Sequence, residues 1–249
     1  MNWKIAKNKL IDFLNKELEK SKQKGLIVGL SGGLDSAIVA VLCKEAVKEN
    51  LKCVIMPTHY SSDQSLKDAL SLCKKFDLSY EIVDIAPLLK PYEQSMQNDK
   101  LRIGNFSARL RMAVLFDLSA KYHSLVVGTS NKSEIMLGYS TIYGDSAYAI
   151  NPIGELYKSD LFDFARVLGI NDEIISKAPS GDLWQGQSDE EDLGYSYKEL
   201  DIVIKELFDK KRSKEELYND GFSQKIVEFV LLRYNNTIFK RTLPKIAIV

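Results

Sequence analysis

The sequence predicts an α/β protein in which a parallel β-sheet carries helices on both faces and the C-terminal part is helical. In the first half of the chain, short apolar runs of strand length alternate with longer segments of helical spacing, the pattern of strands joined by crossover helices. In the C-terminal third, helical spacing continues through 196–234. Because no repeat and no interdomain linker interrupts the chain, we expect residues 1–249 to form a single domain.

The composition narrows the classes of protein to consider. The 249 residues are 45% hydrophobic, which is enough for one sizeable core. The 34 Lys and Arg residues balance the 34 Asp and Glu residues, which argues against a nucleic-acid partner held mainly through its phosphates. No apolar run reaches the roughly 20 residues that span a bilayer, and the N-terminus does not resemble a signal peptide. Three cysteines without a CxxC pair indicate reduced thiols in a cytoplasmic protein without a membrane partner.

The elements of the first half follow from apolar spacing and from the residues that stop each run. Apolar residues recur near helical spacing from Trp3 to Leu18, so residues 1–24 are predicted to form an amphipathic helix that Gly25 ends. The wholly apolar run 25–30 predicts a strand buried on both faces. The next predicted elements are a helix at 36–48, a strand at 51–56 ended by Pro57, a helix at 63–76 capped by Ser61 or Ser62, and a strand at 80–85.

The second half contains longer polar segments. Residues 90–100 have no clean period and predict a loop or an irregular helix, whereas 105–122 predicts a helix and 124–129 a strand. The segment 130–157 is rich in Gly, Ser, Tyr and Asn, and we expect a long functional loop there. A helix at 158–168 follows, closed by Gly169, and then an acidic segment at 181–194 that we expect to be a mobile loop.

The hexapeptide SGGLDS at 31–36 lies between the first predicted strand and the helix that follows it. Its glycines allow a tight turn that exposes successive N–H groups, and the helix points its positive N-terminus at the same place. Ser31 and Ser36 add hydroxyl donors. The segment is therefore typical of a site for a polyanion such as pyrophosphate. It matches neither GxxxxGK[ST] nor GxGxxG.

Asp35 indicates that a cation takes part in this site. A carboxylate repels neighbouring phosphates unless a cation lies between them, and Mg²⁺ binds carboxylate and phosphate oxygens together. The alternative is an ordinary glycine turn in which Asp35 and Ser36 only cap the helix. Because the chain has just two histidines, His59 and His123, a His-rich metal site is excluded.

The hexapeptide resembles the signature of the PP-loop ATP pyrophosphatases, a superfamily that splits ATP between its α and β phosphates. Other segments are similar to one branch of that superfamily, the NAD synthetases. They are GTSNKSE (128–134), GYSTIYGD (138–145), NPIGELYK (151–158), FKRTLP (239–244), NFSARLR (105–111) and APS (178–180). The resemblance covers nearly the whole chain, and it implies a Rossmann-like fold of the adenine nucleotide α-hydrolase type.

The resemblance implies a role for each matching residue. For ATP binding these are Gly29, Ser31, Gly32, Gly33, Asp35, Ser36, Arg109, Thr129, Lys158 and Ser180. For the nicotinate dinucleotide they are Asn105, Tyr143, Asp145 and Lys240, and for Mg²⁺ they are Asp35, Glu134 and Ser180. The implied catalytic residues are Asp35, Lys158 and Lys240, with the lysines stabilising charge on the leaving pyrophosphate or the adenylate. Without the resemblance, Glu134 would be a solvated helix charge and Arg109 could equally belong to a surface salt bridge.

The implied reaction is the ATP-dependent amidation of nicotinic acid adenine dinucleotide to NAD⁺ with ammonia, by a carbon–nitrogen ligase of NAD biosynthesis. The nicotinate carboxylate would attack the α-phosphorus of ATP and release pyrophosphate, and ammonia would then displace AMP from the acyl adenylate. The phosphate loop begins at Ser31, which leaves no room for an N-terminal amidase domain, so we expect free ammonia or ammonia from a separate protein. The resemblance also implies a homodimer with the dinucleotide site near the subunit interface.

Three positions depart from the family pattern. Phe239 stands where the family often has His, Ala149 where some members have an acidic residue, and Ile55 where some have Arg. We therefore expect the ATP-cleaving core to be kept and the contacts to the dinucleotide and the adenine to differ. One alternative is a tRNA-modifying PP-loop enzyme, which predicts a basic RNA-binding extension or catalytic cysteines. Another is a nucleotide-binding sensor, which predicts ATP binding without turnover.

Overall fold

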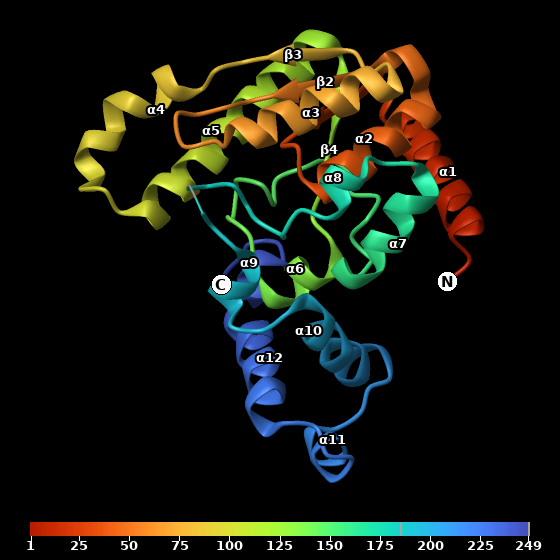
Figure 1. Cartoon of the computed structure of the whole chain (residues 1–249), viewed down its shortest axis with the longest axis vertical. Coiled ribbons are helices and arrows are strands. Elements are labelled where there is room, and N and C mark those ends of the chain that lie inside the picture. Colours follow the sequence, from red (N-terminus) through yellow and green to blue (C-terminus); the bar gives the residue numbers. More distant parts are fainter. Residues whose placement is uncertain (185, 249) are drawn as a thin grey trace.

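Four parallel strands form one sheet in the part of the chain that the computed structural model describes, residues 1–184 and 186–248 (Figure 1). The strand order is β3-β2-β1-β4. The strands are β1 (Gly25–Gly29), β2 (Leu51–Ile55), β3 (Tyr80–Ile82) and β4 (Ser124–Val127). In the middle of the sheet, Val28 of β1 pairs with Cys53 of β2 and with Val127 of β4. Because all pairs are parallel, the carboxyl ends of the strands meet at one edge.

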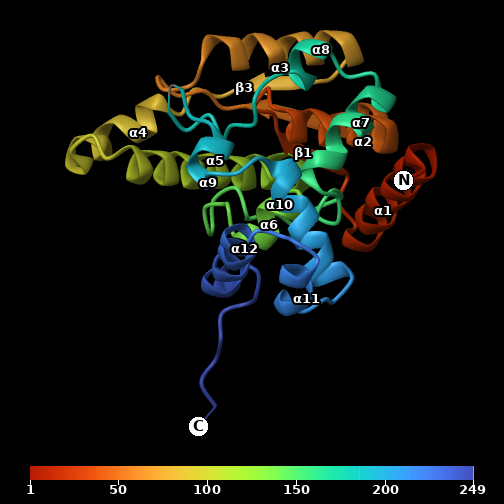
Figure 2. The ribbon, with the colours of Figure 1, turned by 60° about the horizontal axis from the view of Figure 1, so that its bottom comes forward.

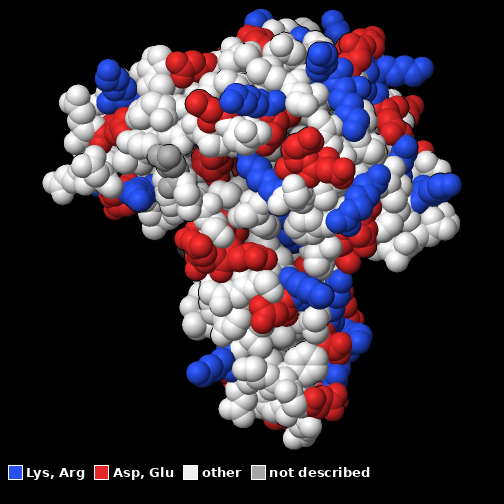
Figure 3. Space-filling view, viewed as in Figure 1, with Lys and Arg blue, Asp and Glu red and all other residues white. Residues whose placement is uncertain are grey.

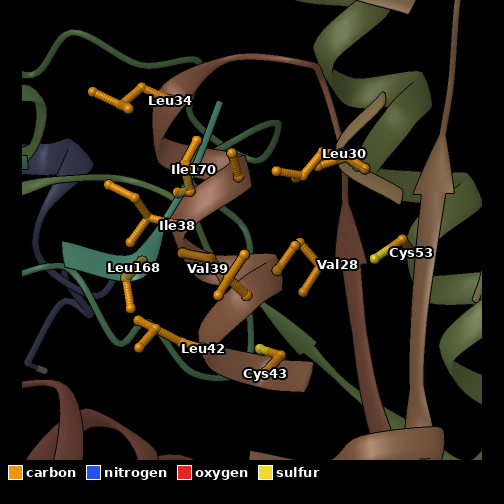
Figure 4. Close-up of a cluster of buried hydrophobic side chains, with 14 of the residues drawn as sticks. Val28, Leu30, Leu34, Ile38, Val39, Leu42, Cys43, Cys53, Leu168 and Ile170 are labelled. Atoms are coloured by element: carbon orange, nitrogen blue, oxygen red, sulfur yellow. The ribbon is translucent and has the colours of Figure 1, made fainter. Parts of the chain in front are cut away.

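Helices cover both faces of this sheet, as the sequence predicts. On one face, Val28 points toward Val39 in a core cluster shared between the sheet and its helices (Figure 4). On the other face, Ile27 and Val54 pack with Leu115. The helices of the first face are α1 (Trp3–Ser21), α2 (Leu34–Val47), α3 (Asp63–Phe76), α7 (Lys158–Leu168) and α8 (Asp172–Ile175), and the long helix of the second is α5 (Lys100–Tyr122).

The C-terminal helices lie below the sheet in Figure 1, and their side chains form a second apolar cluster. They are α10 (Tyr197–Ile204), the π-helical turn η3 (Lys205–Asp209), α11 (Lys214–Asn219) and α12 (Gln224–Asn236). The cluster includes Leu137 of α6 (Lys132–Leu137) and Leu193 of α9 (Asp189–Leu193), so it is joined to the sheet-bearing part. After η4 (Ile238–Lys240) the last residues run away from α12 (Figure 2). The remaining short elements are η1 (Lys48–Asn50), α4 (Ala86–Glu93) and η2 (Gln94–Met96).

Several predicted bounds agree with the structure and others are wrong for identifiable reasons. The bounds of α3 and α7 are those predicted, and Ser62 caps α3. The segment 130–157 is not wholly a loop, because Asn131 and Glu134 form a capping box that begins α6. The segment 181–194 contains α9, which Ser188 caps, while Gln185 lies outside the described residues.

Two elements of the region between β3 and β4 also begin earlier than predicted. α4 was not predicted from Ala86 because it contains two prolines, which usually interrupt a helix. Pro87 lies in its first turn and Pro91 inside it. Asp99 caps α5, which therefore begins at Lys100. The strand β3 ends at Ile82, three residues earlier than predicted.

Charges of both signs are interspersed over the face shown in Figure 3, with acidic side chains gathered around α9, whose sequence is DEEDL. Among the described residues, no helix has the length and apolar character needed to cross a membrane.

Candidate active site

A cavity of about 840 Å³ opens at the carboxyl ends of β1, β2 and β4. Its wall combines the phosphate loop, the strand ends, the start of α6 and the segment before α9. Ligands of open α/β sheets bind at this edge. Of the residues that the sequence singles out, the wall contains Gly29, Ser31, Gly33, Asp35, Ser36, Asn105, Thr129, Glu134, Asp145, Lys158, Ser180 and Lys240.

The loop 31–36 is closed by its own hydroxyl groups. The amide of Ser31 donates to Ser36 Oγ (3.2 Å), and the amide of Gly33 donates to Ser31 Oγ (3.2 Å). Ser36 Oγ donates in turn to the carbonyl oxygen of Gly33 (3.0 Å). The N-cap of α2 is Gly33, which has no side chain to cap the helix, so the first amides of α2 remain available to a ligand.

Gly32 fits a position that no other residue could occupy without strain. Its φ is +82°, a left-handed conformation that favours glycine. A Cβ at this position would lie 2.1 Å from the carbonyl oxygen of Ser65 in α3. The close approach of the loop to α3 therefore depends on the missing side chain.

Three charged groups from three separate elements meet beside this loop. Asp35, in the first turn of α2, forms an ion pair with Lys158 at the start of α7. Lys158 Nζ also lies 3.7 Å from Glu134 Oε1 in α6. Asn131 Nδ2 donates to Asp35 Oδ1 (2.8 Å), while the amide of Asn131 donates to Glu134 Oε2 (3.2 Å). Asn131, which the sequence analysis did not single out, thus ties the two carboxylates together.

Burial and mutual repulsion set the protonation of this group. Burial, followed by the charge of Asp35, raises the pKa of Glu134 well above its ordinary value. Burial opposes the charge on Lys158, but Asp35 and then Glu134 outweigh it and raise the pKa of the Lys158 ammonium. Lys158 is 4% exposed, so a cation is held inside the protein by two carboxylates.

Asp189 adds a third buried carboxylate that sequence reasoning missed. Its Oδ1 accepts from the amide of Gly181 (3.0 Å) and from the hydroxyl of Tyr139 (3.2 Å). Burial raises the pKa of Asp189, and the charge of Lys158 opposes that rise. The signal that could have found it is Ser188, an N-cap residue just before an acidic first turn.

The donor set fits a divalent cation that brings further ligands with it. Asp35 and Glu134 lie against one ammonium, and in addition to burial the charges of Asp35 and Asp189 raise the pKa of Glu134, a repulsion that a divalent cation would relieve. Within the described ranges, no three His, Cys, Asp or Glu side chains converge closely enough to hold a metal by themselves. Mg²⁺ commonly takes one or two carboxylates and completes its shell with phosphate and water. Ser180 Oγ also lines the cavity, where it accepts from the amide of Asp182 (3.0 Å).

Another part of the wall is built around the segment 138–145. Lys240 Nζ donates to the carbonyl oxygens of Gly138 (2.8 Å) and Ser140 (2.6 Å). Burial, followed by the charge of Arg233, lowers the pKa of Lys240. Lys240 therefore holds this segment in place as well as lining the cavity.

Other side chains singled out from the sequence anchor the same segment. Asp145 Oδ1 accepts from the amide of Thr141 (2.7 Å), and Thr141 Oγ1 donates to Asn105 Oδ1 (2.6 Å). Burial raises the pKa of Asp145. Arg109 is not among the residues that line the cavity, and its Nε donates to the carbonyl oxygen of Ile142 (3.3 Å). Tyr143 is exposed and also lies outside the wall.

Among the further cations in the wall, Arg111 and Lys177 were given no role from the sequence. Arg111 Nε donates to the carbonyl oxygen of Met56 (3.0 Å), and burial lowers the pKa of the guanidinium. Lys177 Nζ donates to Ser65 Oγ (2.8 Å) and pairs with Asp68 (3.2 Å), which ties the segment before Ser180 to α3. No local motif contains Lys177, whose partners in α3 are distant in sequence, whereas Arg111 ends the segment NFSARLR (105–111).

The sequence and the structure of this chain are both similar to those of known proteins. The family model for NAD synthase matches residues 6–244. The chain is 51% identical over 241 residues to the NH₃-dependent NAD⁺ synthetase of Wolinella succinogenes, covering 96% of this chain and 94% of the relative. The structure of the NH₃-dependent NAD synthetase from Campylobacter jejuni in complex with nitrate is similar over 100% of both chains, with a TM-score of 0.86 and 38% identity. The structure of an NMN synthetase from Francisella tularensis is similar over 99% of both chains, with a TM-score of 0.88 and 31% identity.

Proposed function

The chain belongs to the NAD synthase family, and from this premise we propose that it catalyses the ATP-dependent amidation of nicotinic acid adenine dinucleotide to NAD⁺ with ammonia. It is accordingly a ligase that forms a carbon–nitrogen bond in NAD biosynthesis. The observation that carries the proposal is the cavity at the strand ends, where a phosphate-binding loop lies beside the buried group of Asp35, Glu134 and Lys158. Donors for a leaving pyrophosphate and charges beside it are what the cleavage of ATP at its α-phosphorus requires.

The first step activates the carboxylate. An oxygen of the nicotinate carboxylate attacks the α-phosphorus of ATP, and the bond from that phosphorus to the bridging oxygen of the β-phosphate breaks. Pyrophosphate leaves with the bonding electrons, and the amides of the phosphate loop with the hydroxyls of Ser31 and Ser36 stabilise its charge. The ammonium of Lys158 can also stabilise the charge on the leaving pyrophosphate, because Asp35 holds it beside the loop.

The second step forms the amide. Ammonia attacks the carbonyl carbon of the acyl adenylate, the bond to the AMP oxygen breaks, and one proton is lost from the nitrogen. Neither step needs a protein nucleophile, because ATP supplies the activation and ammonia attacks directly. The protein contributes positioning, charge stabilisation and the exclusion of water.

Magnesium fits the residues of this cavity. Asp35 and Glu134, with Ser180, would hold Mg²⁺ together with phosphate oxygens of ATP. When bound, it supplies positive charge to the phosphates from which pyrophosphate departs. This assignment rests on the chemistry of the donors and on the repulsion between the buried carboxylates, which a bound cation would relieve.

The dinucleotide is proposed to bind at the part of the wall built around the segment 138–145. Asn105, Asp145 and Lys240 line the cavity there, and Tyr143 lies exposed on the same segment. Arg109, which holds that segment through Ile142, would act on the substrate by keeping the segment in place. We further propose that the chain works as a single domain in a cytoplasmic homodimer, with Tyr143 available to the second subunit.

A second candidate product is NMN, because the Francisella tularensis structure is that of an NMN synthetase. The sequence favours NAD⁺, since identity to the Wolinella succinogenes NAD⁺ synthetase is 51%, against 31% to the NMN synthetase. NAD⁺ contains an adenylate that NMN lacks, and the carboxylate that is amidated is the same in both substrates. The choice between the two substrates therefore depends on how the adenylate is bound, and the reaction itself is the same.

The test offers the purified protein ATP, Mg²⁺ and ammonium with either nicotinic acid adenine dinucleotide or nicotinic acid mononucleotide. We expect NAD⁺, AMP and pyrophosphate in equal amounts with the dinucleotide, and a much lower kcat/KM with the mononucleotide. Oxygen-18 in the nicotinate carboxylate should appear in AMP, because that oxygen bridges the acyl adenylate. ADP and phosphate as products, or AMP without the label, would refute the mechanism. A preference for the mononucleotide would reassign the substrate.

A further inference from the structure

The two helices that carry Glu134 and Lys158 start side by side but are distant in sequence. Glu134 belongs to the first turn of α6, and Lys158 is the first residue of α7. The residue before α7, Tyr157, provides no side-chain cap for that helix. Something else must therefore bind the first amides of α7 and fix α7 against α6.

Asp201 of α10 supplies the missing contacts. Its Oδ2 accepts from the amide of Ser159 (2.9 Å), and its Oδ1 accepts from Ser133 Oγ (2.5 Å). Ser133 Oγ accepts in turn from the amide of Lys158 (2.9 Å). Ser133 is fully buried and Asp201 is 1% exposed, so water does not compete for these bonds. One carboxylate thus caps α7 and reaches α6 through a single hydroxyl.

Asp209 makes a second connection between the same two helices. Its Oδ1 accepts from Lys132 Nζ (2.9 Å), and its Oδ2 accepts from the hydroxyl of Tyr157 (2.9 Å). Lys132 immediately precedes Ser133, and Tyr157 immediately precedes Lys158. Asp201 and Asp209 therefore join neighbouring positions of the same pair of helix starts. We call these two carboxylates the aspartate clamp.

The π-helical turn explains how both carboxylates reach one side. At 3.6 residues per turn, side chains eight positions apart point about 80° away from each other, whereas those seven apart differ by about 20°. η3 follows α10 directly, and its amide of Lys210 bonds to the carbonyl oxygen of Lys205 (3.0 Å), five residues back. A π turn takes up one extra residue, so Asp209 returns to the face of Asp201.

From these contacts we infer that the aspartate clamp positions Lys158 and Glu134 for the cleavage of ATP. Asp201 and Asp209 are positioning residues, because they act through Ser133, Lys132 and the start of α7. The inference rests on the proposed function for its activity readout, but the geometry it describes is independent of the substrate. The inference also means that the C-terminal helices contribute to the reaction, although most residues that line the cavity belong to the sheet-bearing part.

The first variants are Asp201→Asn and Ser133→Ala, which break the same link from its two ends. Because misplacing a catalytic group by about 1 Å can cost roughly a hundredfold in rate, we expect each to lower kcat by about 10- to 100-fold with KM for ATP little changed. Asp160→Asn is the matched control. Asp160 lies in the first turn of α7 and pairs with Lys205 of η3 (3.1 Å), but among the described residues it has no bond to α6. We expect near wild-type kcat for this control.

A double-mutant cycle separates positioning from a general loss of stability. In a Lys158→Met background, Ser133→Ala should cause a smaller further loss of kcat than in the wild type, because one of the two groups that the clamp positions is already gone. A further loss as large as in the wild-type background would overturn the inference, as would an equal loss in Asp160→Asn. Should Asp201→Asn not fold, Ser133→Ala still decides the matter, because it removes one oxygen atom from a small buried side chain.

Crystal structures of the wild type and Ser133→Ala give a readout without turnover. The distance from Lys158 Nζ to Glu134 Oε1, 3.7 Å here, should change and the start of α7 should shift relative to α6. An unchanged geometry would contradict the clamp even if the rate fell. A wild-type protein that forms no NAD⁺ would instead refute the proposed function and leave this structural comparison as the test of the clamp.

Discussion

Lys158 is held between Asp35 and Glu134 in a part of the protein where an unpaired charge would be costly. The ion pair with Asp35 and the approach to Glu134 raise the pKa of the ammonium against the opposing effect of burial. Removing one partner of such a buried group leaves the others uncompensated. Substitutions here are therefore expected to act on charge balance as well as on the reaction.

Asp35→Asn and Glu134→Gln are predicted to lower kcat by about 100-fold or more, because each removes one ligand charge beside the phosphate loop. The Mg²⁺ concentration for half-maximal rate should rise in both variants. Steady-state rates over a range of Mg²⁺ concentrations at saturating ATP measure this. Wild-type activity with an unchanged Mg²⁺ dependence would remove these residues from the metal site.

Gly32→Ala is predicted to lower the free energy of unfolding by about 1 to 3 kcal/mol and to weaken ATP binding, because of its positive φ and the carbonyl of Ser65. Gly33→Ala is the matched control for stability. Gly33 has a φ of −91°, and a Cβ there would meet only Ser31 Oγ, at 3.3 Å. Urea unfolding and calorimetric titration with ATP give both quantities. Equal destabilisation by the two changes would show that the contact with α3 is unimportant.

Local motifs allowed the sequence to predict some of the cavity residues but not others. Asp35, Glu134 and Lys158 each stand in a short recognisable segment, and the structure brings them together. Ser188 marks the helix start that carries Asp189. The contacts of Asp189 with Tyr139 and of Asp201 with Ser133 could not be predicted, because these partners come from segments far away in the chain. Charge partners of this kind depend on tertiary packing, which a single sequence does not reveal.

The stability that the aspartate clamp gives to the junction of α6, α7 and η3 should depend on pH through Asp209. Burial opposes the charge on Asp209, but hydrogen bonds from Lys132 and then Tyr157 outweigh it and hold the pKa of Asp209 below its ordinary value. A carboxyl whose pKa is lower in the folded state contributes stability above its unfolded pKa and loses it as the pH falls through the folded pKa.

We therefore predict that Asp209→Asn is less stable than the wild type near pH 7 and that this difference shrinks as the pH falls below about 4. Urea unfolding of both proteins between pH 7 and pH 3 measures the difference. A difference that stays constant or grows toward low pH would show that the ionised carboxylate does not make these contacts in solution.

Elements with strong periodicity could be predicted from the sequence, and short capped helices could not. α3 and α7 have clear apolar spacing, Ser62 caps the start of α3 and Gly169 ends α7, so their bounds were predicted. α6 has only six residues, too few for a period to show in a segment rich in Gly and Tyr. Its capping box of Asn131 and Glu134 was the available signal, and it coincides with the carboxylate of the cavity.

The burial of the three cysteines indicates which nitrogen donor the protein can use. Cys43, Cys53 and Cys73 are all buried in the core. Burial raises the pKa of Cys53 to about 12 and that of Cys73 to about 11. Burial also raises the pKa of Cys43 well above its ordinary value. A thiol that attacks glutamine needs a low pKa and access to solvent, so none of these three is suited to that reaction.

We predict that glutamine does not replace ammonium as nitrogen donor. NAD⁺ formation with glutamine freed of ammonia should not exceed the rate without a donor, whereas ammonium chloride should support full turnover. Adding a separate glutaminase should restore the rate with glutamine, which shows that the enzyme itself is active in that mixture. Equal rates with purified glutamine and ammonium would contradict the prediction.

The ion pair of Lys158 also bears on the order in which ligands arrive. Before the nucleotide binds, the ammonium acts as a resident counterion for Asp35 and Glu134, so a free divalent ion would have to displace it from a buried position. ATP carrying its own metal offers the ammonium new partners in its phosphates, and the two cations can then exchange places. We therefore expect the protein to bind a nucleotide already complexed with metal more tightly than either component alone.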